Sequence, residues 1–326
     1  MVSHPVQGDG ATESDLAESW YSQDLQLTNI IHREKFLGGE AVAKKTAVYS
    51  STGRLKRVLL GKPTYYEILP LNAPSHDLHD AGVKPDRETG LKQHKEFEDV
   101  FVQLGIEISW VKLTPKLPWG MFTRDLGVNT PDGVLIGRFR YTERKGEEGM
   151  AKETLQELGE TILSKQISRG AVEGGDCFWL DENTLVIGNG NRSTYSGFEN
   201  AKEILSEYGK RVFVVEFLSK WNHLDIIFQP VAERLAVVCE NAVPDYFIGI
   251  LDALGWELIK VPGEYAFKTE INMLALGDDK VLSFRGNRIN EMLKAHGLEV
   301  FDPEFSNFTA VGGGPHCLSF ELEREP

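Results

Sequence analysis

Five stretches of the chain share one pattern, in which apolar positions at helical spacing end at a glycine and a short alternating run follows. Helical spacing predicts an amphipathic helix, and alternation predicts a half-buried strand. Each glycine falls where a helix commonly ends in a left-handed residue. The stretches are residues 95–111, 150–165, 201–215, 245–261 and 287–301, with their glycines at Gly105, Gly159, Gly209, Gly255 and Gly297.

Pairs of short β-rich runs lie between these stretches. Residues 177–188 and 273–284 each hold two apolar runs separated by Asp-Glu-Asn or Gly-Asp-Asp, which suit hairpin turns. Residues 54–61 provide an opening strand for the first stretch. Five strand–strand–helix–strand units without a linker predict an α/β fold closed into a five-fold pseudosymmetric propeller of ββαβ units. A chance register of glycines in an ordinary α/β protein is the alternative.

The repeat also predicts the domain organisation. Residues 46–326 form a single propeller domain in this interpretation, and the polar residues 1–45 form an N-terminal extension with a helix near Asp15–Tyr21. Residues 70–94 are rich in Pro, Gly and His, so we expect a long loop there that is able to act as a lid.

Composition narrows the class of protein. The 326 residues are 41% hydrophobic and 26% charged, as in ordinary globular proteins, and no apolar run approaches the roughly 18 residues of a membrane span. We therefore expect a cytoplasmic protein without a membrane partner. The net charge of −14, without a basic stripe, argues against a nucleic-acid partner. The cysteines Cys177, Cys239 and Cys317 are too few and too widely spaced for a disulfide framework or a zinc pair.

Polar residues interrupt the apolar surroundings at a similar point beyond each repeated stretch. Singly, each has a plainer explanation: a surface charge, a tight turn, a core histidine or a buried cysteine. In a closed ring, however, these points converge on one pocket. The segments are MFTRD with Asp125, EGGD with Glu173, HLD with His223, KTEIN with Thr269 and GGGPHC with Cys317.

The predicted pocket therefore combines a thiol, an imidazole and several carboxylates. An unperturbed thiol has a pKa of about 8.5 and needs a positive neighbour to attack at neutral pH. A histidine can act as general acid and then as general base when a carboxylate orients it. Additional carboxylates suit a planar cationic substrate, because they match guanidinium geometry. This combination of thiol, imidazole and carboxylates predicts a small cationic guanidino substrate.

The segments FTRD, EGGD, HLD and GGGPHC, in this order, resemble the guanidino-modifying enzymes of the pentein superfamily. This superfamily includes arginine deiminase, dimethylarginine dimethylaminohydrolase, agmatine deiminase and the glycine amidinotransferases. The resemblance extends from about residue 50 to the C-terminus and implies a five-bladed α/β propeller that uses no cofactor and no metal. It does not decide between a monomer and a homo-oligomer.

The resemblance implies a role for each matching residue. Cys317 would attack the guanidinium carbon and form a covalent amidino-thioether, and His223 would protonate the departing amine and then activate water. Glu173 would orient His223. Asp125 and Asp225 would bind the guanidinium nitrogens, while Asp176 would brace its loop beside the substrate.

Arginine deiminase looks nearest within the superfamily. Residues 138–147 and 190–194 resemble its arginine-containing segments, which makes Arg140 or Arg144, with Arg192, candidates for binding an α-carboxylate. A solvated charged face is their plainer explanation. Asp225 favours an unsubstituted terminal guanidine, because methylarginine hydrolases generally lack this carboxylate. The expected reaction converts L-arginine, or a close guanidino analogue, to the ureido product and ammonia.

Several features depart from arginine deiminase and keep other functions open. The chain is shorter, lacks an arginine before the glycine run, and has Trp119 close before Phe122, where it could narrow the pocket or stack on a substrate. The alternatives are a dimethylarginine dimethylaminohydrolase, an amidinotransferase, a non-catalytic binding protein with the same fold, or a metal hydrolase using His223, Asp225 and Glu173.

Overall fold

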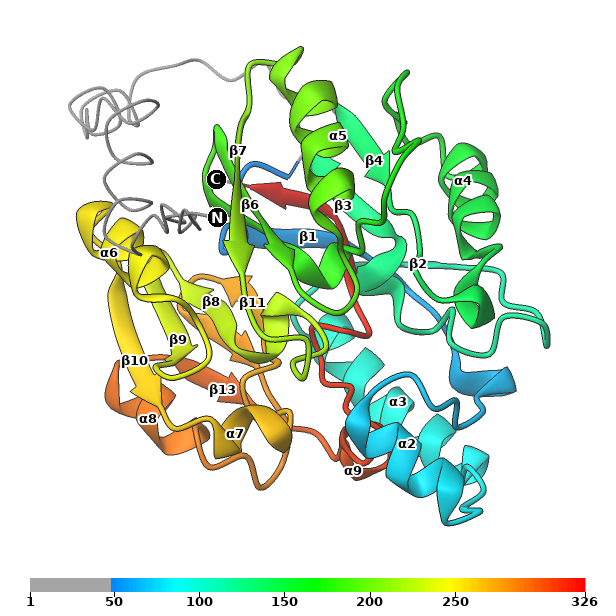
Figure 1. Cartoon of the computed structure of the whole chain (residues 1–326). Coiled ribbons are helices and arrows are strands. Elements are labelled where there is room, and N and C mark those ends of the chain that lie inside the picture. The colour runs from blue at the N-terminus through cyan, green and yellow to red at the C-terminus, as the bar shows by residue number, and fades with distance from the viewer. Residues whose placement is uncertain (1–47, 326) are drawn as a thin grey trace, which may run out of the picture.

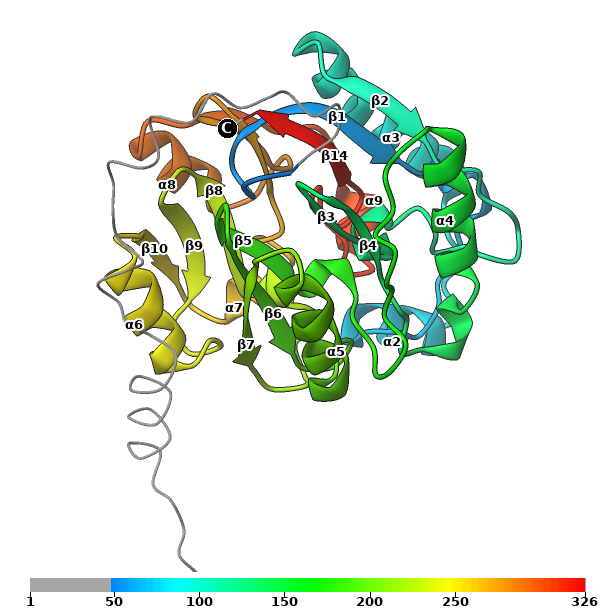
Figure 2. The ribbon, with the colours of Figure 1, turned by 90° about the horizontal axis from the view of Figure 1, so that it is seen from above.

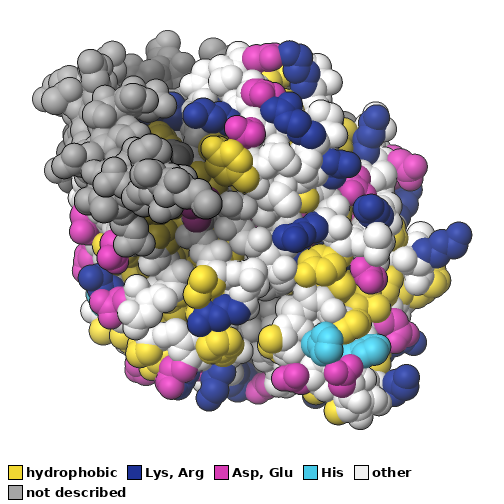
Figure 3. Space-filling view, viewed as in Figure 1, with side chains coloured by type: hydrophobic (Ala, Val, Ile, Leu, Met, Phe, Trp, Pro, Cys, Tyr) yellow, Lys and Arg dark blue, Asp and Glu magenta, His cyan; other side chains and the backbone are white. Residues whose placement is uncertain are grey.

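Five small β-sheets organise residues 48–325, the part of the chain that this computed structural model describes (Figure 1). The predicted extension 1–45 and its helix near Asp15–Tyr21 lie outside these residues. Within them, no helix has the length and apolar character needed to cross a membrane. On the face shown in Figure 3, basic and acidic side chains are interspersed.

The sheets follow one another along the chain, except that the last strand returns to the first sheet. In spatial order, the first sheet contains β14 (Phe320–Glu325), β1 (Arg54–Leu60) and β2 (Glu107–Trp110), and the second contains β3 (Gly127–Thr130) and β4 (Gly133–Ile136). The third sheet contains β5 (Cys177–Asp181), β6 (Thr184–Asn189) and β7 (Arg211–Glu216), and the fourth contains β8 (Phe228–Ala232), β9 (Leu235–Cys239) and β10 (Glu257–Val261). The fifth sheet contains β11 (Leu274–Gly277), β12 (Lys280–Leu282) and β13 (Glu299–Phe301).

Helices connect the strands. The α-helices are α2 (Ala73–Asp80), α3 (Arg87–Gln103), α4 (Glu147–Glu157), α5 (Tyr195–Ser206), α6 (Asp245–Ala253), α7 (Glu264–Phe267), α8 (Asn290–Ala295) and α9 (Ser306–Thr309). Short 3₁₀ turns are η3 (Pro63–Tyr65), η4 (Thr123–Leu126), η5 (Thr142–Arg144), η6 (Gly174–Asp176) and η7 (Leu224–Ile226).

The predicted strand–strand–helix–strand unit is present. In the third sheet β5 pairs antiparallel with β6, and β6 pairs parallel with β7 after α5. The fourth and fifth sheets repeat this arrangement. In the first sheet, β14 is the antiparallel partner of β1, with Leu59 opposite Phe320.

The five sheets form a ring. Each contacts the next, and β1 of the first sheet contacts β11 of the fifth. Figure 2, viewed from above, shows the sheets around a common centre and the helices toward the outside. The turns η4, η6 and η7 meet one another, and they lie directly before β3, β5 and β8. The polar motifs of successive units are therefore brought together.

The helix-ending glycines confirm the repeat. Gly105, Gly159, Gly209, Gly255 and Gly297 all have φ between 67° and 87°. This is the left-handed region that a side chain disfavours, and after four of the five glycines, all but Gly159, a strand begins two residues later.

Two predictions about individual segments are wrong. Residues 70–94 are mostly helical, because Asn72 caps α2 through the Ser75 N–H and Asp86 caps α3 through the Thr89 N–H. Residues 160–165 form only an isolated bridge between Ile162 and Val134 instead of a strand. The side chain of Gln166 there bonds the Ile136 N–H and the Val134 carbonyl, which occupies backbone groups of β4.

Candidate active site

Cys317 lies in a tightly held loop that precedes β14. The cysteine is 5% exposed, and its Sγ lies 3.6 Å from Asp225 Oδ2. Its N–H donates to Asn272 Oδ1 at 3.0 Å, and its carbonyl accepts from the Arg124 N–H at 3.1 Å. The preceding glycines are needed because a Cβ on Gly313 would stand 2.4 Å from the ring of Phe122.

Asp225 contacts both Cys317 and His316, a histidine next to Cys317 in the chain. His316 Nδ1 lies 2.9 Å from Asp225 Oδ2, and the His316 ring stacks on Phe178. Burial opposes ionisation of Asp225, but the hydrogen bond to His316 keeps the pKa of its carboxyl below the usual value. Burial and the charges of Asp225 and Asp125 hold the pKa of the Cys317 thiol well above its ordinary value.

His223 lies between two carboxylates. Its Nε2 is 3.1 Å from Glu173 Oε2 and 3.6 Å from Asp125 Oδ1. Burial alone would lower the pKa of His223, but Asp125, Asp176 and Glu173 raise it to about 9. The imidazole is therefore protonated at neutral pH. Gly175 lets the EGGD turn approach it, because a Cβ there would lie 2.9 Å from the ring.

Two buried arginines bind carboxylates of this cluster. Arg192 Nη1 donates to Glu173 Oε2 at 3.0 Å, and its Nη2 donates to the Leu71 carbonyl at 3.0 Å. Despite burial, Arg192 and His223 keep the pKa of Glu173 below its usual range. Arg144 Nη1 bonds Asp125 Oδ2. Both arginines are fully buried in the described region, so neither is part of a solvated charged face.

Arg144 is clamped by the first residue of α4. Its Nε and Nη2 donate to the two carboxylate oxygens of Glu147 at 3.0 and 2.7 Å. Glu147 lies in the first turn of the helix, where a negative charge is electrostatically favoured. With Asp125 also bound, the guanidinium is committed to protein carboxylates. Arg140 differs, because its side chain is exposed and donates to the Asn191 carbonyl, while its N–H lies 3.3 Å from Glu173 Oε1.

The remaining predicted residues shape the loops. Asp176 accepts hydrogen bonds from the Ser193 N–H and hydroxyl and from the Leu224 N–H, so it braces η6 against η7. Burial raises the pKa of Asp176 to about 7. Trp119 is buried, packs on Phe122 with ring centroids 5.0 Å apart, and donates its indole N–H to the Glu67 carbonyl.

Two buried carboxylate oxygens, Asp125 Oδ1 and Asp225 Oδ1, have no hydrogen-bond partner within residues 48–325. Leaving such oxygens without a donor is costly. The surrounding cluster also contains more carboxylates than arginines. Its carboxylates are Asp125, Glu147, Glu173, Asp176 and Asp225, and its arginines are Arg144 and Arg192. The arrangement fits a cation with several N–H donors.

Three polar residues of this cluster were missed in the sequence. His316 precedes Cys317 in GGGPHC, so its position beside the predicted nucleophile was the available signal. Asn272 lies three residues after Thr269, which the repeat had placed at the pocket. Glu147 lies outside the repeated polar segments and ends residues 138–147, which drew attention in the sequence only for their arginines.

A metal site is a poorer fit to this geometry. Asp125, Glu173 and His223 present ligand atoms within 4.8 Å of one another. Arginines already pair with both carboxylates, however, and a metal would have to displace the proton that the raised pKa of His223 favours. The trio expected from sequence included Asp225, but this residue contacts Cys317 and His316.

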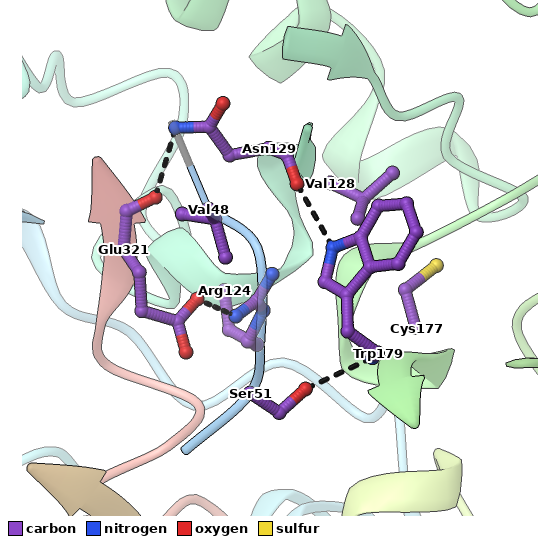
Figure 4. Close-up of a pocket in the computed structure, with 8 residues that line it drawn as sticks. All are labelled: Val48, Ser51, Arg124, Val128, Asn129, Cys177, Trp179 and Glu321. Carbon is purple, nitrogen blue, oxygen red and sulfur yellow. Dashed lines mark hydrogen bonds and ion pairs between the residues drawn. The ribbon is translucent and has the colours of Figure 1, made fainter. Parts of the chain in front are cut away.

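A small cavity lies apart from the candidate site. It is bounded by Val48, Ser51, Arg124, Val128, Asn129, Cys177, Trp179 and Glu321, none of which is a predicted site residue (Figure 4). Arg124 bonds Glu321 there. The MFTRD segment thus contributes one charge to this cavity and another to the cluster.

Comparisons with known proteins agree with this fold. Residues 71–324 match the family model for N,N dimethylarginine dimethylhydrolase, eukaryotic. YkgA of Bacillus subtilis, described as uncharacterized, is 26% identical over 282 residues, which cover 86% of this chain and 96% of YkgA.

Solved structures share the fold. The N-terminal domain of ArgZ, an arginine dihydrolase from cyanobacteria, superposes with a TM-score of 0.73 at 22% identity, covering 82% of this chain and 97% of that one. A cysteine-to-serine variant of dimethylarginine dimethylaminohydrolase from Pseudomonas aeruginosa, complexed with citrulline, gives 0.70 at 21% identity, covering 82% and 100%.

The ring of mixed sheets and these matches define a relative of the guanidino-modifying enzymes of the pentein superfamily. Within it, the chain belongs to the dimethylarginine dimethylaminohydrolase family. The predicted superfamily is confirmed, but the matches do not single out arginine deiminase as the nearest relative.

Proposed function

We propose that this protein hydrolyses a guanidino group through a covalent amidino-thioether on Cys317, with its five sheets acting as the blades of a pentein propeller. The observation that carries the proposal is a pair of buried oxygens without a hydrogen-bond partner, Asp125 Oδ1 and Asp225 Oδ1, with Asp225 in contact with Cys317. A guanidinium ion supplies N–H donors in one plane and a positive charge. It would satisfy both carboxylates and offset the charge that keeps Cys317 protonated.

The reaction follows from these positions. With the cation bound, Cys317 releases its proton to solvent, and the thiolate forms a bond to the guanidinium carbon. Protonated His223 gives its proton to the departing nitrogen, the C–N bond breaks, and the amine that leaves takes up a proton from solvent. Neutral His223 then takes a proton from water, and the water oxygen attacks the same carbon. The C–S bond breaks, the hydroxyl proton of the product passes to the Cys317 sulfur, and a ureido compound leaves with the thiol and protonated His223 restored.

Asp225 supports a terminal guanidine without methyl groups as the substrate. Neither Asp125 Oδ1 nor Asp225 Oδ1 accepts a hydrogen bond from the protein, and a doubly methylated nitrogen would offer no N–H to the carboxylate that it faces. L-arginine or a close analogue is our first candidate. The family match favours a methylated arginine instead, which is the second candidate.

The three predicted arginines would have different roles in binding the rest of the substrate. Arg144 and Arg192 hold Asp125 and Glu173, so we propose that they position enzyme carboxylates. Arg140 is exposed beside the site and is the better candidate for a substrate carboxylate.

Product analysis tests the proposal. The purified protein is incubated with L-arginine, methylated arginines and other guanidino compounds, with and without an amine acceptor. We expect a ureido product and ammonia from an unsubstituted guanidine. A ureido product with an alkylamine would favour the methylarginine reaction, and amidino transfer to the acceptor would favour a transferase. No product and no adduct on Cys317 with any compound would contradict an enzymatic role.

A further inference from the structure

We propose that Asn272 is a positioning residue that fixes Cys317 against Asp225. This inference rests on the proposed covalent function of Cys317. Asn272 is fully buried, and its amide bridges two segments of the site. Its Oδ1 accepts from the Cys317 N–H at 3.0 Å, and its Nδ2 donates to the Asp225 carbonyl at 3.4 Å.

The bridge leaves the nucleophile little freedom. The Cys317 peptide is held at its N–H by Asn272 and at its carbonyl by the Arg124 N–H. Gly314 packs directly on Asn272, because a Cβ there would lie 2.5 Å from its carbonyl oxygen and 2.7 Å from Oδ1. Asn272 therefore determines how the nucleophile loop sits relative to the 3.6 Å contact between Cys317 Sγ and Asp225.

An unusual turn presents Asn272. Thr269 has φ of 62°, a region in which a β-branched residue is strained. The Asn272 N–H closes the turn on the Thr269 carbonyl at 3.1 Å. Arg288 anchors the turn through both oxygens of Glu270. Strain that the surroundings maintain in this way is typical of segments that place a functional side chain.

The bridge also has a chemical consequence. In acyl transfer, a backbone N–H at the nucleophile commonly stabilises an oxyanion. Here the Cys317 N–H is engaged by Asn272, so it cannot serve in that way. A guanidinium substrate develops no oxyanion on attack, and its nitrogens need carboxylates. The use of this N–H for positioning is consistent with such a substrate.

Asn272→Ala tests the assignment. We expect kcat to fall about 100-fold, as for a small misplacement of a reacting group, with KM changed less than about three-fold. Alkylation of Cys317 by iodoacetamide, followed against pH, should shift its midpoint downward by about one unit, because the thiol is released from Asp225. The control is Asn290→Ala, since Asn290 is a buried asparagine of the same unit that also makes two hydrogen bonds, to Ser283 and Phe284.

Asn272→Asp is the second variant, for the case in which the alanine variant does not fold. It keeps the size and the acceptor, but it adds a charge beside the thiol, so the alkylation midpoint should rise and kcat should fall. Unchanged kcat and midpoint in either folded variant, or an equal loss in Asn290→Ala, would overturn the assignment. A wild type that turns over no guanidino compound counts against the proposed function instead, while the alkylation midpoints still decide on Asn272.

Discussion

The chemistry of Cys317 depends on how burial and neighbouring charges combine at a single sulfur atom. Burial and two aspartates keep the thiol protonated in the unliganded protein. The same aspartates are the groups that a guanidinium would neutralise. We therefore expect the nucleophile to be activated by the substrate that it attacks. An unliganded protein of this kind would react slowly with general thiol reagents.

Cys317→Ser should abolish turnover while preserving substrate binding. A hydroxyl in place of the thiol lacks the nucleophilicity that the first step requires, and we expect a loss of more than about 10⁴-fold in kcat. Isothermal titration of the variant with the substrate should give a dissociation constant within a few-fold of the wild-type value. Near-wild-type turnover would contradict the covalent mechanism.

His223 should make stability depend on pH in a definite direction. Its pKa is raised to about 9 in the fold, against about 6.5 in an unfolded chain. Its contribution, on the order of 3 kcal/mol, is therefore complete below pH 6.5 and is lost as the pH rises through 9. Urea unfolding at several pH values should show a steeper decline for wild type than for His223→Asn.

The interval above about pH 8 makes this comparison specific. Burial raises the pKa of Asp176 and of Glu147 to about 7, so these carboxyls are half ionised at that pH and largely ionised one unit above it. Parallel curves for the two proteins between about pH 8 and 10 would show that His223 is not protonated preferentially in the folded state.

Sequence reasoning reached the residues that occupy repeated positions. It placed Asp125, Glu173, His223 and Cys317 at one pocket, and the structure brings these side chains into one buried cluster. It did not identify Glu147 or Asn272, because their roles depend on the residues that they contact in the folded chain. The sequence also does not distinguish an arginine that binds buried carboxylates from an arginine that faces solvent.

At the scale of elements, helix α4 holds one wall of the site. Its first residue, Glu147, binds Arg144 at two points, and Arg144 in turn bonds Asp125. The placement of Asp125, which we propose to bind the guanidinium, thus depends on where this helix begins. A negative side chain in the first turn of a helix is also electrostatically favoured.

Glu147→Gln should therefore weaken substrate binding more than catalysis. An amide cannot match both donors of Arg144 with charge, so Arg144 and Asp125 would lose their fixed orientation. We expect KM to rise about ten-fold with a smaller change in kcat, measured by steady-state kinetics. Glu153→Gln, an exposed change on the same helix, is the control. A fall in kcat alone would argue that Arg144 acts on the chemical step.

The elements themselves were predictable where local chemistry determines them. The five glycines mark helix ends in both sequence and structure. The hairpin at Gly277–Lys280 likewise follows from its turn residues, since Asp278 and Asp279 adopt positive φ. Residues 70–94 were misjudged because their Pro, Gly and His content hid two helix caps, Asn72 and Asp86.

At the scale of the whole molecule, ring closure depends on contacts between the two ends of the repeat. The pairing of β14 with β1 joins residues more than 260 positions apart, so no local pattern predicts it. The same pairing places Cys317, just before β14, beside residues of the second and fourth units. The site is therefore complete only when the ring is closed.

Arg324 should be central to this closure. It is buried in β14 and donates to the carbonyls of Ala275 and Gly53 and to Glu321, which joins the last strand to the fifth sheet. Arg324→Met would leave Glu321 with one cation fewer, and we expect urea unfolding to show a loss of about 3 kcal/mol. Glu325→Gln, which removes an exposed pair with Lys56 on the same strands, should cost less than about 1 kcal/mol. Equal effects would mean that the buried arginine does not hold the ring together, and closure would then rest on the β14–β1 ladder and the apolar contacts between the sheets.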